Sequence, residues 1–538
     1  MTLRRWVGAA LFFTALTVFM TWPQARRIGD ASVAHQDIYF NMWRLAWVAH
    51  AVTTNPRHLF DANIFYPEPR TLTYSDAMIV EGLVATPLIR ARCPPVLVHN
   101  LLLLGAIVVS GLGMFTLARY LTGSTAAALL AGVIFCFAPY RYEHYMHMEL
   151  QWAMWMPWAF WAVHRTLDTG AWRFGVAAGA MAALQMLSSI YYGVLLATLL
   201  APAAVLLFVA DRRASRWRVA RSLAAGLAVA ALICGAYARP YVRTRAQVGD
   251  RPIDELSRYS ARPANYLIAT PNNRLYGERV ARRSPPERRL FPGALPVLLA
   301  LIGLFARKPS SRQIVYLLVL VIAFELSLGL GGFSFSFLYE HVGAFRSLRA
   351  LARAGMFVLM FLAVLAAYGY AAIADRRSRA VRHVAFGVWL LGLVVEYSVR
   401  PMELVPYPNT APPVYDFLAR QPAGVVAEFP VPQASALPGP DPAYAYDSTF
   451  HWFPLVNGYS GFYPQSYVDR LDRLAAFPDA RALAQLRRDD VRYVIVHSAG
   501  APDARFADLA RDVENTAAFI QLGRFSDRGG EAVLFRMR

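Results

Sequence analysis

Long apolar runs constrain this chain more than any other feature. Stretches of about 18 residues with few or no charges recur along most of its length, and each is long enough to cross a bilayer as a helix. Of the 538 residues, 57% are hydrophobic and 17% are charged, too few charges for a soluble protein of this size. The sequence therefore predicts an α-helical multi-pass membrane domain with about eleven transmembrane helices. The runs cover residues 6–22, 96–118, 124–139, 151–167, 172–189, 193–210, 219–238, 292–306, 313–331, 352–374 and 382–398.

Charges between the runs predict the orientation. Arg residues gather in short alternate loops, as the positive-inside rule requires when the N-terminus is cytoplasmic. The net charge of +19 is therefore attributed to orientation in the membrane, and no nucleic-acid partner is expected. Pro23 and Gln24 follow the first run where a signal peptide would have small residues, so we expect this helix to be retained. The loops 23–95, 140–150, 240–291 and 332–351 are then outside, and so is everything after residue 398.

The C-terminal part of the chain has a different pattern. A Pro-rich linker at 399–413 separates a membrane domain at 1–398, with large outer loops at 23–95 and 240–291, from residues 414–538. Strands alternate with helices there, which predicts a small α/β extracytoplasmic domain. The expected elements are a helix at 414–420, a strand at 425–429, a helix at 471–486 and strands at 491–497 and 532–535.

The first outer loop holds a candidate catalytic carboxylate. Asp37 lies shortly after the first run, between His35 and Asn41, which are candidate substrate ligands. A carboxylate here could take a proton from an acceptor hydroxyl. It could instead hold a divalent cation, Mg²⁺ or Mn²⁺, for which Asp30 is the other candidate ligand. The alternative is a solvated residue that caps a helix starting at residue 38.

The second outer loop is rich in polar and aromatic side chains. Arg141, His144, His147 and Glu149 are candidate phosphate or metal ligands, because a helix here would bring residues three and four apart together. The order Glu-His-x-x-His differs from the zinc-protease motif His-Glu-x-x-His, so no metalloprotease is predicted. A polar contact network at the membrane edge is the alternative.

The fourth outer loop ends in FRSLRALAR, where helical spacing would place Arg346, Arg349 and Arg353 on one face. Planar guanidinium groups suit phosphate or pyrophosphate. The alternative is that these side chains reach to lipid phosphates at the membrane surface.

Together these features resemble the GT-C class of membrane glycosyltransferases, and the chain is similar to bacterial YfhO-like membrane proteins. The resemblance is carried by segments 35–37, 65–67, 141–151, 291–293, 349–353 and 448–461. It implies a cytoplasmic N-terminus, an acidic catalytic residue in the first outer loop and a polyprenyl-phosphate sugar donor. Many GT-C enzymes pair two acids in this loop, whereas Asp37 has Gln36 beside it. No cofactor is therefore certain, and dependence on Mg²⁺ or Mn²⁺ stays open.

The resemblance implies a transferase that moves a sugar to a glycan, lipid or cell-envelope polymer outside the bacterial cytoplasmic membrane, by a displacement that inverts the anomeric centre. Asp37 would be the base and the Arg residues of the fourth loop the phosphate clamp. Four residues of segment 448–461 would contact sugar, although a Gly-rich structural loop is the alternative; they are His451, Trp452, Asn457 and Tyr459. A transporter or lipid flippase and a non-catalytic membrane scaffold remain as other functions.

Overall fold

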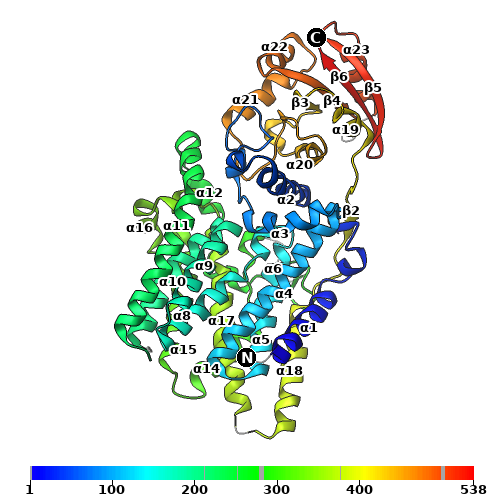
Figure 1. Cartoon of the computed structure of the whole chain (residues 1–538). Coiled ribbons are helices and arrows are strands. Elements are labelled where there is room, and N and C mark those ends of the chain that lie inside the picture. The colour runs from blue at the N-terminus through cyan, green and yellow to red at the C-terminus, as the bar shows by residue number, and fades with distance from the viewer. Residues whose placement is uncertain (1–2, 211–212, 251, 278–283, 376, 499–502) are drawn as a thin grey trace. The chain divides into compact units, whose positions relative to one another are not determined.

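The computed structural model in Figure 1 describes residues 3–210, 213–250, 252–277, 284–375, 377–498 and 503–538. A helix covers each of the predicted runs. Within the described ranges, seven helical stretches are long and apolar enough to cross a membrane. They are α1 (Leu3–Met20), α4 (Pro95–Thr122), Thr125–Glu143 with α5 (Thr125–Phe137) and α6 (Pro139–Glu143), α10 (Ile190–Ala210), α11 (Arg216–Val248), Leu351–Ala374 with α17 (Gly355–Ala374), and α18 (Arg379–Tyr397).

Shorter helices occupy the other predicted runs. They are α8 (Trp155–Thr169), α9 (Trp172–Ser188), α14 (Ala294–Phe305) and α15 (Ser311–Ser327). Between the long helices lie α7 (Met148–Gln151), α12 (Ile253–Arg258) and α16 (Phe335–His341). The prediction of a helical multi-pass membrane domain is confirmed, while seven described helices rather than eleven have the length and hydropathy of a span.

Glycines allow α14 and α17 to approach closely. A Cβ atom on Gly369 would lie 1.8 Å from the Leu299 carbonyl oxygen, and one on Gly303 would lie 2.5 Å from that of Leu365. Lipid tails are as apolar as the helix surface, so such helices associate through close packing of small residues. Gly303 and Gly369 therefore fix the distance between α14 and α17.

We predict that Gly369→Ala destabilises the protein, because the new methyl group can be accommodated only if the two helices move apart. Overpacking of this kind costs about 1–3 kcal/mol. The measurement is thermal unfolding of the purified protein in detergent. Gly387→Ala in α18 is the control, because a Cβ there meets nothing within 4 Å; equal melting of both variants would show that the α14–α17 contact is not tight.

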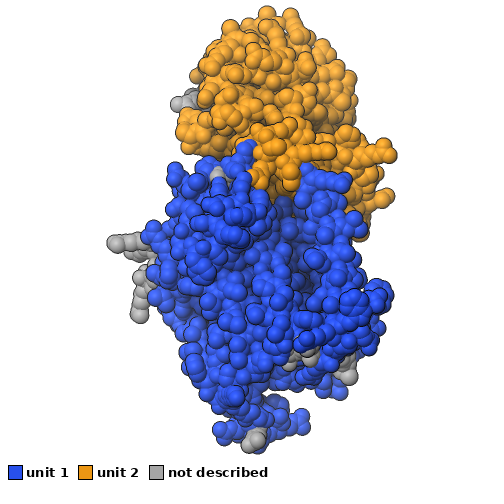
Figure 2. Space-filling view, turned by 90° about the vertical axis from the view of Figure 1, so that its left-hand side faces the viewer, with its two compact units in different colours: residues 1–26, 101–239, 249–403 blue, residues 27–100, 240–248, 404–538 orange. Residues whose placement is uncertain are grey.

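Contacts divide the chain into two compact units, coloured separately in Figure 2. Unit 1 comprises residues 1–26, 101–239 and 249–403, and unit 2 comprises residues 27–100, 240–248 and 404–538. The first outer loop, which the sequence assigns to the membrane domain, thus groups with the C-terminal part of the chain. The predicted domain boundary at residue 398 itself remains a prediction.

The C-terminal part of unit 2 is an α/β domain with a four-stranded sheet in the order β3-β4-β6-β5. β3 and β4 are parallel, and the other two pairings are antiparallel. Buried side chains such as Phe429, Val494 and Phe535 form its core. The elements are α19 (Pro413–Leu418), β3 (Val425–Phe429), α20 (Asp441–Asp447), α21 (Gln465–Leu474), α22 (Ala480–Arg488), β4 (Val491–His497), α23 (Asp503–Glu514), β5 (Phe519–Asp527) and β6 (Gly530–Met537).

One prediction for this part of the chain is wrong. The single helix expected at 471–486 is two helices, α21 and α22, because Pro478 cannot continue a helix and Asp479 caps α22 by accepting from the Ala482 N–H at 2.7 Å. The linker at 399–413 contains a strand, β2 (Leu404–Pro406), which pairs antiparallel with β1 (Ala31–Val33). This pairing joins the first outer loop to the start of the C-terminal segment.

Candidate active site

The first outer loop contributes α2 (Gln36–Thr54) and α3 (Ile79–Arg90) to unit 2. α2 begins at Gln36 because the His35 side chain caps it: Nδ1 accepts a hydrogen bond from the Asp37 backbone N–H at 3.1 Å. The Tyr407 hydroxyl holds the backbone that leads into α2. It accepts a hydrogen bond from the His35 N–H at 3.1 Å and donates one to the Val33 carbonyl oxygen at 2.8 Å. The capping residue is therefore His35, and Asp37 lies in the first turn of the helix.

Asp37 is nearly buried, with 12% of its side chain exposed. The Tyr459 hydroxyl donates a hydrogen bond to Oδ1, and Oδ2 lies 3.6 Å from His35 Nδ1. Burial and the negative charge of Asp37 raise the pKa of Tyr459 well above its usual value, so the phenol stays protonated and keeps donating. Tyr459 thus holds one oxygen of the Asp37 carboxylate, and a carboxylate positioned in this way can act as a general base.

The same face of α2 continues with Asn41 and Arg44, four and seven residues after Asp37. Arg44 Nη2 donates to Asn41 Oδ1 at 2.5 Å, and Nη1 donates to the Asp76 carbonyl oxygen at 2.9 Å. Asn41 Nδ2 lies 3.5 Å from His99 Nε2. Both side chains are buried. Sequence reasoning missed Arg44, although its helical spacing from Asp37 and Asn41 was a usable signal.

The four candidate sugar-binding residues of segment 448–461 have different contacts. Asn457 is structural: it pairs with the backbone of Glu428 through bonds of 2.8 and 3.0 Å. His451 Nδ1 accepts from the Phe453 N–H at 2.9 Å, and burial lowers its pKa to about 3, so it is neutral. Tyr459 reaches Asp37, and Trp452 stacks on His50 of α2.

Unit 1 contains a separate buried polar network centred on Glu287. Arg353 Nη2 donates to Glu287 Oε1 at 2.8 Å, and its guanidinium lies 4.4 Å from the centre of the Tyr191 ring. Burial opposes ionisation of Glu287, but the charge of Arg353 outweighs it and holds the Glu287 pKa far below its usual range. Burial lowers the pKa of His144 to about 3. Its contact of 3.5 Å with Glu287 therefore involves a neutral imidazole.

The predicted helical face of Arg346, Arg349 and Arg353 is wrong. Residues 343–347 and 351–354 form short 3-10 turns, with non-helical residues between them. Arg346 Nε donates to the Tyr339 carbonyl oxygen at 2.9 Å, and Arg349 Nη1 contacts Glu255 Oε1 at 3.2 Å. Each guanidinium thus has its own protein acceptor.

The second outer loop is likewise broken, into α6 and α7, so the single helix expected to carry Arg141, His144, His147 and Glu149 does not form. Arg141 is buried and donates through Nη2 to the Gln151 carbonyl oxygen at 2.9 Å. Its Nε and Nη1 atoms have no hydrogen-bond acceptor among the described residues. The structure also places Glu149 in a buried position at the start of α7.

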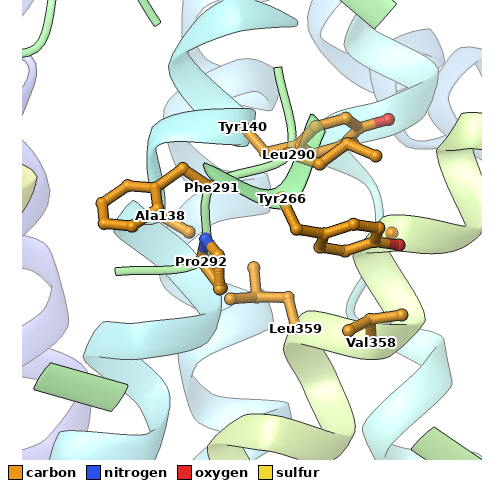
Figure 3. Close-up of a pocket in the computed structure, with 9 residues that line it drawn as sticks. Ala138, Tyr140, Tyr266, Leu290, Phe291, Pro292, Val358 and Leu359 are labelled. Carbon is orange, nitrogen blue, oxygen red and sulfur yellow. The ribbon is translucent and has the colours of Figure 1, made fainter. Parts of the chain in front are cut away.

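A small cavity lies beside this network, and Figure 3 shows its lining. It has a volume of about 10 Å³ and lies between the start of α6, the loop before α14 and the first turns of α17. The Tyr140 and Tyr266 rings and Leu290 cover it, with Pro292 and Leu359 below them in this view. The Tyr266 hydroxyl contacts Ser327 Oγ at 2.8 Å. The lining is mainly apolar.

The described residues do not form a metal site: they contain no group of three or more His, Cys, Asp or Glu side chains placed to hold an ion. Asp30, the other predicted ligand, pairs with Arg27 Nε at 2.7 Å on the surface. Asp37 has a phenol hydroxyl on one oxygen. A divalent cation would need more oxygen ligands than this side chain supplies.

Comparison with known proteins identifies the fold. No protein-family profile and no curated protein sequence matches the chain. The arabinofuranosyltransferase AftD from Mycobacteria is similar over 100% of this chain and 40% of its own, with a TM-score of 0.65 and 14% identity. The archaeal oligosaccharyltransferase AglB from Archaeoglobus fulgidus is similar over 99% and 74%, with a TM-score of 0.53 and 13% identity.

A third similar structure is ArnT from Cupriavidus metallidurans, over 98% of both chains, with a TM-score of 0.50 and 12% identity. The chain therefore has the fold of the GT-C membrane glycosyltransferases. It spans 40% of the length of AftD. The narrower resemblance to YfhO-like proteins stays a prediction.

We predict that Glu287→Gln strongly destabilises unit 1, because it leaves the Arg353 guanidinium buried without a counter-charge. Breaking a buried ion pair in this way costs about 3–5 kcal/mol. Glu255→Gln is the matched control, since the Glu255–Arg349 pair is partly exposed and such pairs contribute about 1 kcal/mol or less. Thermal unfolding in detergent compares the two; a Glu287 variant that melts like the Glu255 variant would contradict the prediction.

Proposed function

We propose that this chain is a membrane glycosyltransferase that moves a sugar from a polyprenyl-phosphate donor to an acceptor outside the cytoplasmic membrane. The observation that carries the proposal is the Asp37 carboxylate: nearly buried, at the start of α2 and hydrogen-bonded by Tyr459, in a chain with the GT-C fold. The oligosaccharyltransferase AglB, which shares this fold, was solved with a dolichol-phosphate. That lipid phosphate supports the choice of donor class.

Asp37 acts as the base. The acceptor hydroxyl oxygen attacks the anomeric carbon, the bond from that carbon to the phosphate oxygen breaks, and the hydroxyl proton passes to Asp37. Polyprenyl phosphate leaves with the bonding electrons, and a single displacement inverts the anomeric centre. Tyr459 orients the carboxylate through Oδ1, and the carboxylate receives the proton. Such positioned proton transfer contributes about 10²–10⁴-fold in rate.

The donor phosphate needs cationic hydrogen-bond donors. The Arg residues of the fourth outer loop contact protein acceptors, whereas Arg141 has two N–H-bearing nitrogens without an acceptor in the described part of the chain. A phosphate would satisfy these atoms and the buried charge. We therefore assign phosphate binding to Arg141 rather than to Arg349 and Arg353. No step is routed through a metal ion.

We predict that Asp37→Asn lowers sugar transfer by about 10²–10⁴-fold, because the amide keeps the shape of the side chain but cannot accept the proton. Asp30→Asn is the matched control: it removes the exposed acid of the same loop and should leave transfer near that of the parent protein. The assay follows transfer from polyprenyl-phosphate sugars by purified protein in detergent or liposomes. Melting curves establish that both variants are folded.

Donor binding adds a second readout to this experiment. Asp37→Asn should bind the donor as the parent protein does, since the proposed base does not hold the phosphate. A folded Asp37 variant with full transfer would remove Asp37 from the mechanism. If donor binding instead depends on both Asp37 and added Mg²⁺, the carboxylate is a cation ligand and not the base.

We further infer that the N-terminus is cytoplasmic and the C-terminal domain lies outside, in a bacterial cytoplasmic membrane. The short Arg-rich loops carry this inference. We predict that alkaline phosphatase is active when fused after residue 538 and inactive when fused after residue 214. A cytoplasmic reporter at the same two positions should give the opposite result. Active phosphatase at residue 214 alone would place Asp37 on the cytoplasmic side.

A further inference from the structure

An aromatic ladder runs along α2 within unit 2. Tyr459 packs edge-on against Phe40 with ring centres 5.0 Å apart, Phe40 stacks on Trp43 at 5.5 Å, and Trp43 stacks on Trp47 at 6.5 Å. Phe40, Trp43 and Trp47 are buried, so the middle of the ladder cannot contact a ligand. Its effect is to fix the two ends relative to each other: the Asp37–Tyr459 pair at one end and the last turn of α2 at the other.

At the far end, His50 and Trp452 form a face-to-face stack. Their ring centres are 4.1 Å apart with planes 14° from parallel, and Trp47 lies 5.9 Å from the Trp452 ring. Both side chains are half-buried. Neither the indole N–H nor the imidazole nitrogens have a hydrogen-bond partner among the described side chains and backbone. The pair thus presents an apolar ring surface, with the indole N–H and the imidazole nitrogens at its edge.

The backbone at Trp452 is strained. Its φ of +59° lies in the left-handed region, which a bulky residue rarely adopts. Neighbouring bonds hold it there: the Trp452 N–H donates to the Ser448 carbonyl oxygen at 2.7 Å, and the Phe453 N–H donates to His451 Nδ1 at 2.9 Å. Strain that the surroundings enforce at one residue is a common mark of a ligand-binding position.

We propose that the His50–Trp452 stack is an acceptor-sugar subsite, and that the acceptor is therefore an extended glycan. His50 is thirteen residues beyond Asp37 on one helix, which places the two roughly 20 Å apart along its axis. A glycan with its reacting hydroxyl at Asp37 must be several sugars long to reach the stack. This inference rests on the proposed function and names its acceptor class.

The chemistry of the stack favours a sugar. One face of a sugar ring presents C–H groups, which pack on an aromatic ring, and its rim presents hydroxyl groups, which need donors and acceptors. Burial lowers the pKa of His50, so the imidazole is neutral near pH 7 and offers one donor and one acceptor. Trp452 adds its N–H donor. A neutral stack suits an uncharged glycan better than a phosphate.

The experiment measures binding and transfer as a function of acceptor length. Gluco-, manno- and arabino-oligosaccharides, from disaccharides to octasaccharides, are titrated by calorimetry into the full-length protein in detergent. In at least one series the parent protein should bind long members more tightly than short ones. Trp452→Ala should remove about two- to tenfold of that gain, the range expected for one aromatic contact. Transfer to short acceptors, which do not reach the stack, should fall less in Trp452→Ala than transfer to long acceptors.

Two further variants separate sugar binding from loss of structure. His50→Phe keeps the ring stack but removes both nitrogens, so it should retain part of the length-dependent gain. Trp172→Ala removes an exposed Trp of unit 1 and should change nothing. Melting curves report whether Trp452→Ala is folded; if it is not, the His50 variant alone decides.

The outcomes distinguish this inference from the proposed function. Affinity that is the same for all lengths in the parent protein, or a length dependence that is undiminished in both Trp452→Ala and His50→Phe, overturns the acceptor subsite. Loss of liposome association with unchanged glycan affinity would identify the stack as a membrane-surface anchor, and also overturns it. Length-dependent binding that needs Trp452, without any sugar transfer, would support the subsite and refute the transferase.

Discussion

The hydrocarbon core of a membrane offers no partner to a backbone N–H or C=O group, and this constraint determines most of the structure. Each chain segment that crosses must satisfy its own hydrogen bonds, and a helix does so within one segment. The long apolar runs therefore become helices, and glycines such as Gly303 and Gly369 let them pack where the hydrophobic effect does not drive association. Sheets and most of the irregular backbone are confined to the segments between and after them. The candidate catalytic groups lie in these segments.

Two kinds of buried charge occur in those segments. The Glu287–Arg353 pair is a closed arrangement, since each charge neutralises the other and a stacked Tyr191 covers the guanidinium. Asp37 and Arg141 differ from it. Asp37 has a neutral phenol on one oxygen, and Arg141 contacts a backbone carbonyl through one nitrogen while its other nitrogens have no acceptor in the described residues. A closed pair stabilises a fold, whereas the unused donors of Arg141 are suited to a substrate that arrives with its own polar atoms.

The sequence predicted the elements whose pattern is local. The strands at 425–429 and 491–497 have the predicted bounds, because a short run of β-branched residues between turn signals indicates a buried strand without further information. β5 was missed because it is a half-exposed edge strand with mixed polarity. The Arg349–Arg353 helix failed for a different reason. Helical spacing shows which residues would share a face if a helix formed, but it does not show that the helix forms. Here the ion pairs of Arg349 with Glu255 and of Arg353 with Glu287 occur in a segment of short 3-10 turns. Asp37 was proposed as the base from its position in the first outer loop. Its hydrogen bond with Tyr459 joins residues far apart in the sequence, so only the structure could show it.

The hydrogen bond between Asp37 and Tyr459 joins residues 422 positions apart in the chain. A ribosome adds about 5–20 residues per second, so the carboxylate waits roughly 20–80 seconds for its partner during synthesis. The strand that pairs with β1, and the Tyr407 that fixes His35, also arrive late. The first outer loop must therefore remain incompletely folded while the membrane helices are inserted, and the candidate base is completed among the last contacts of the protein. A chain that ends before residue 459 lacks this hydrogen bond, so the order of translation leaves the candidate base incomplete in every unfinished copy.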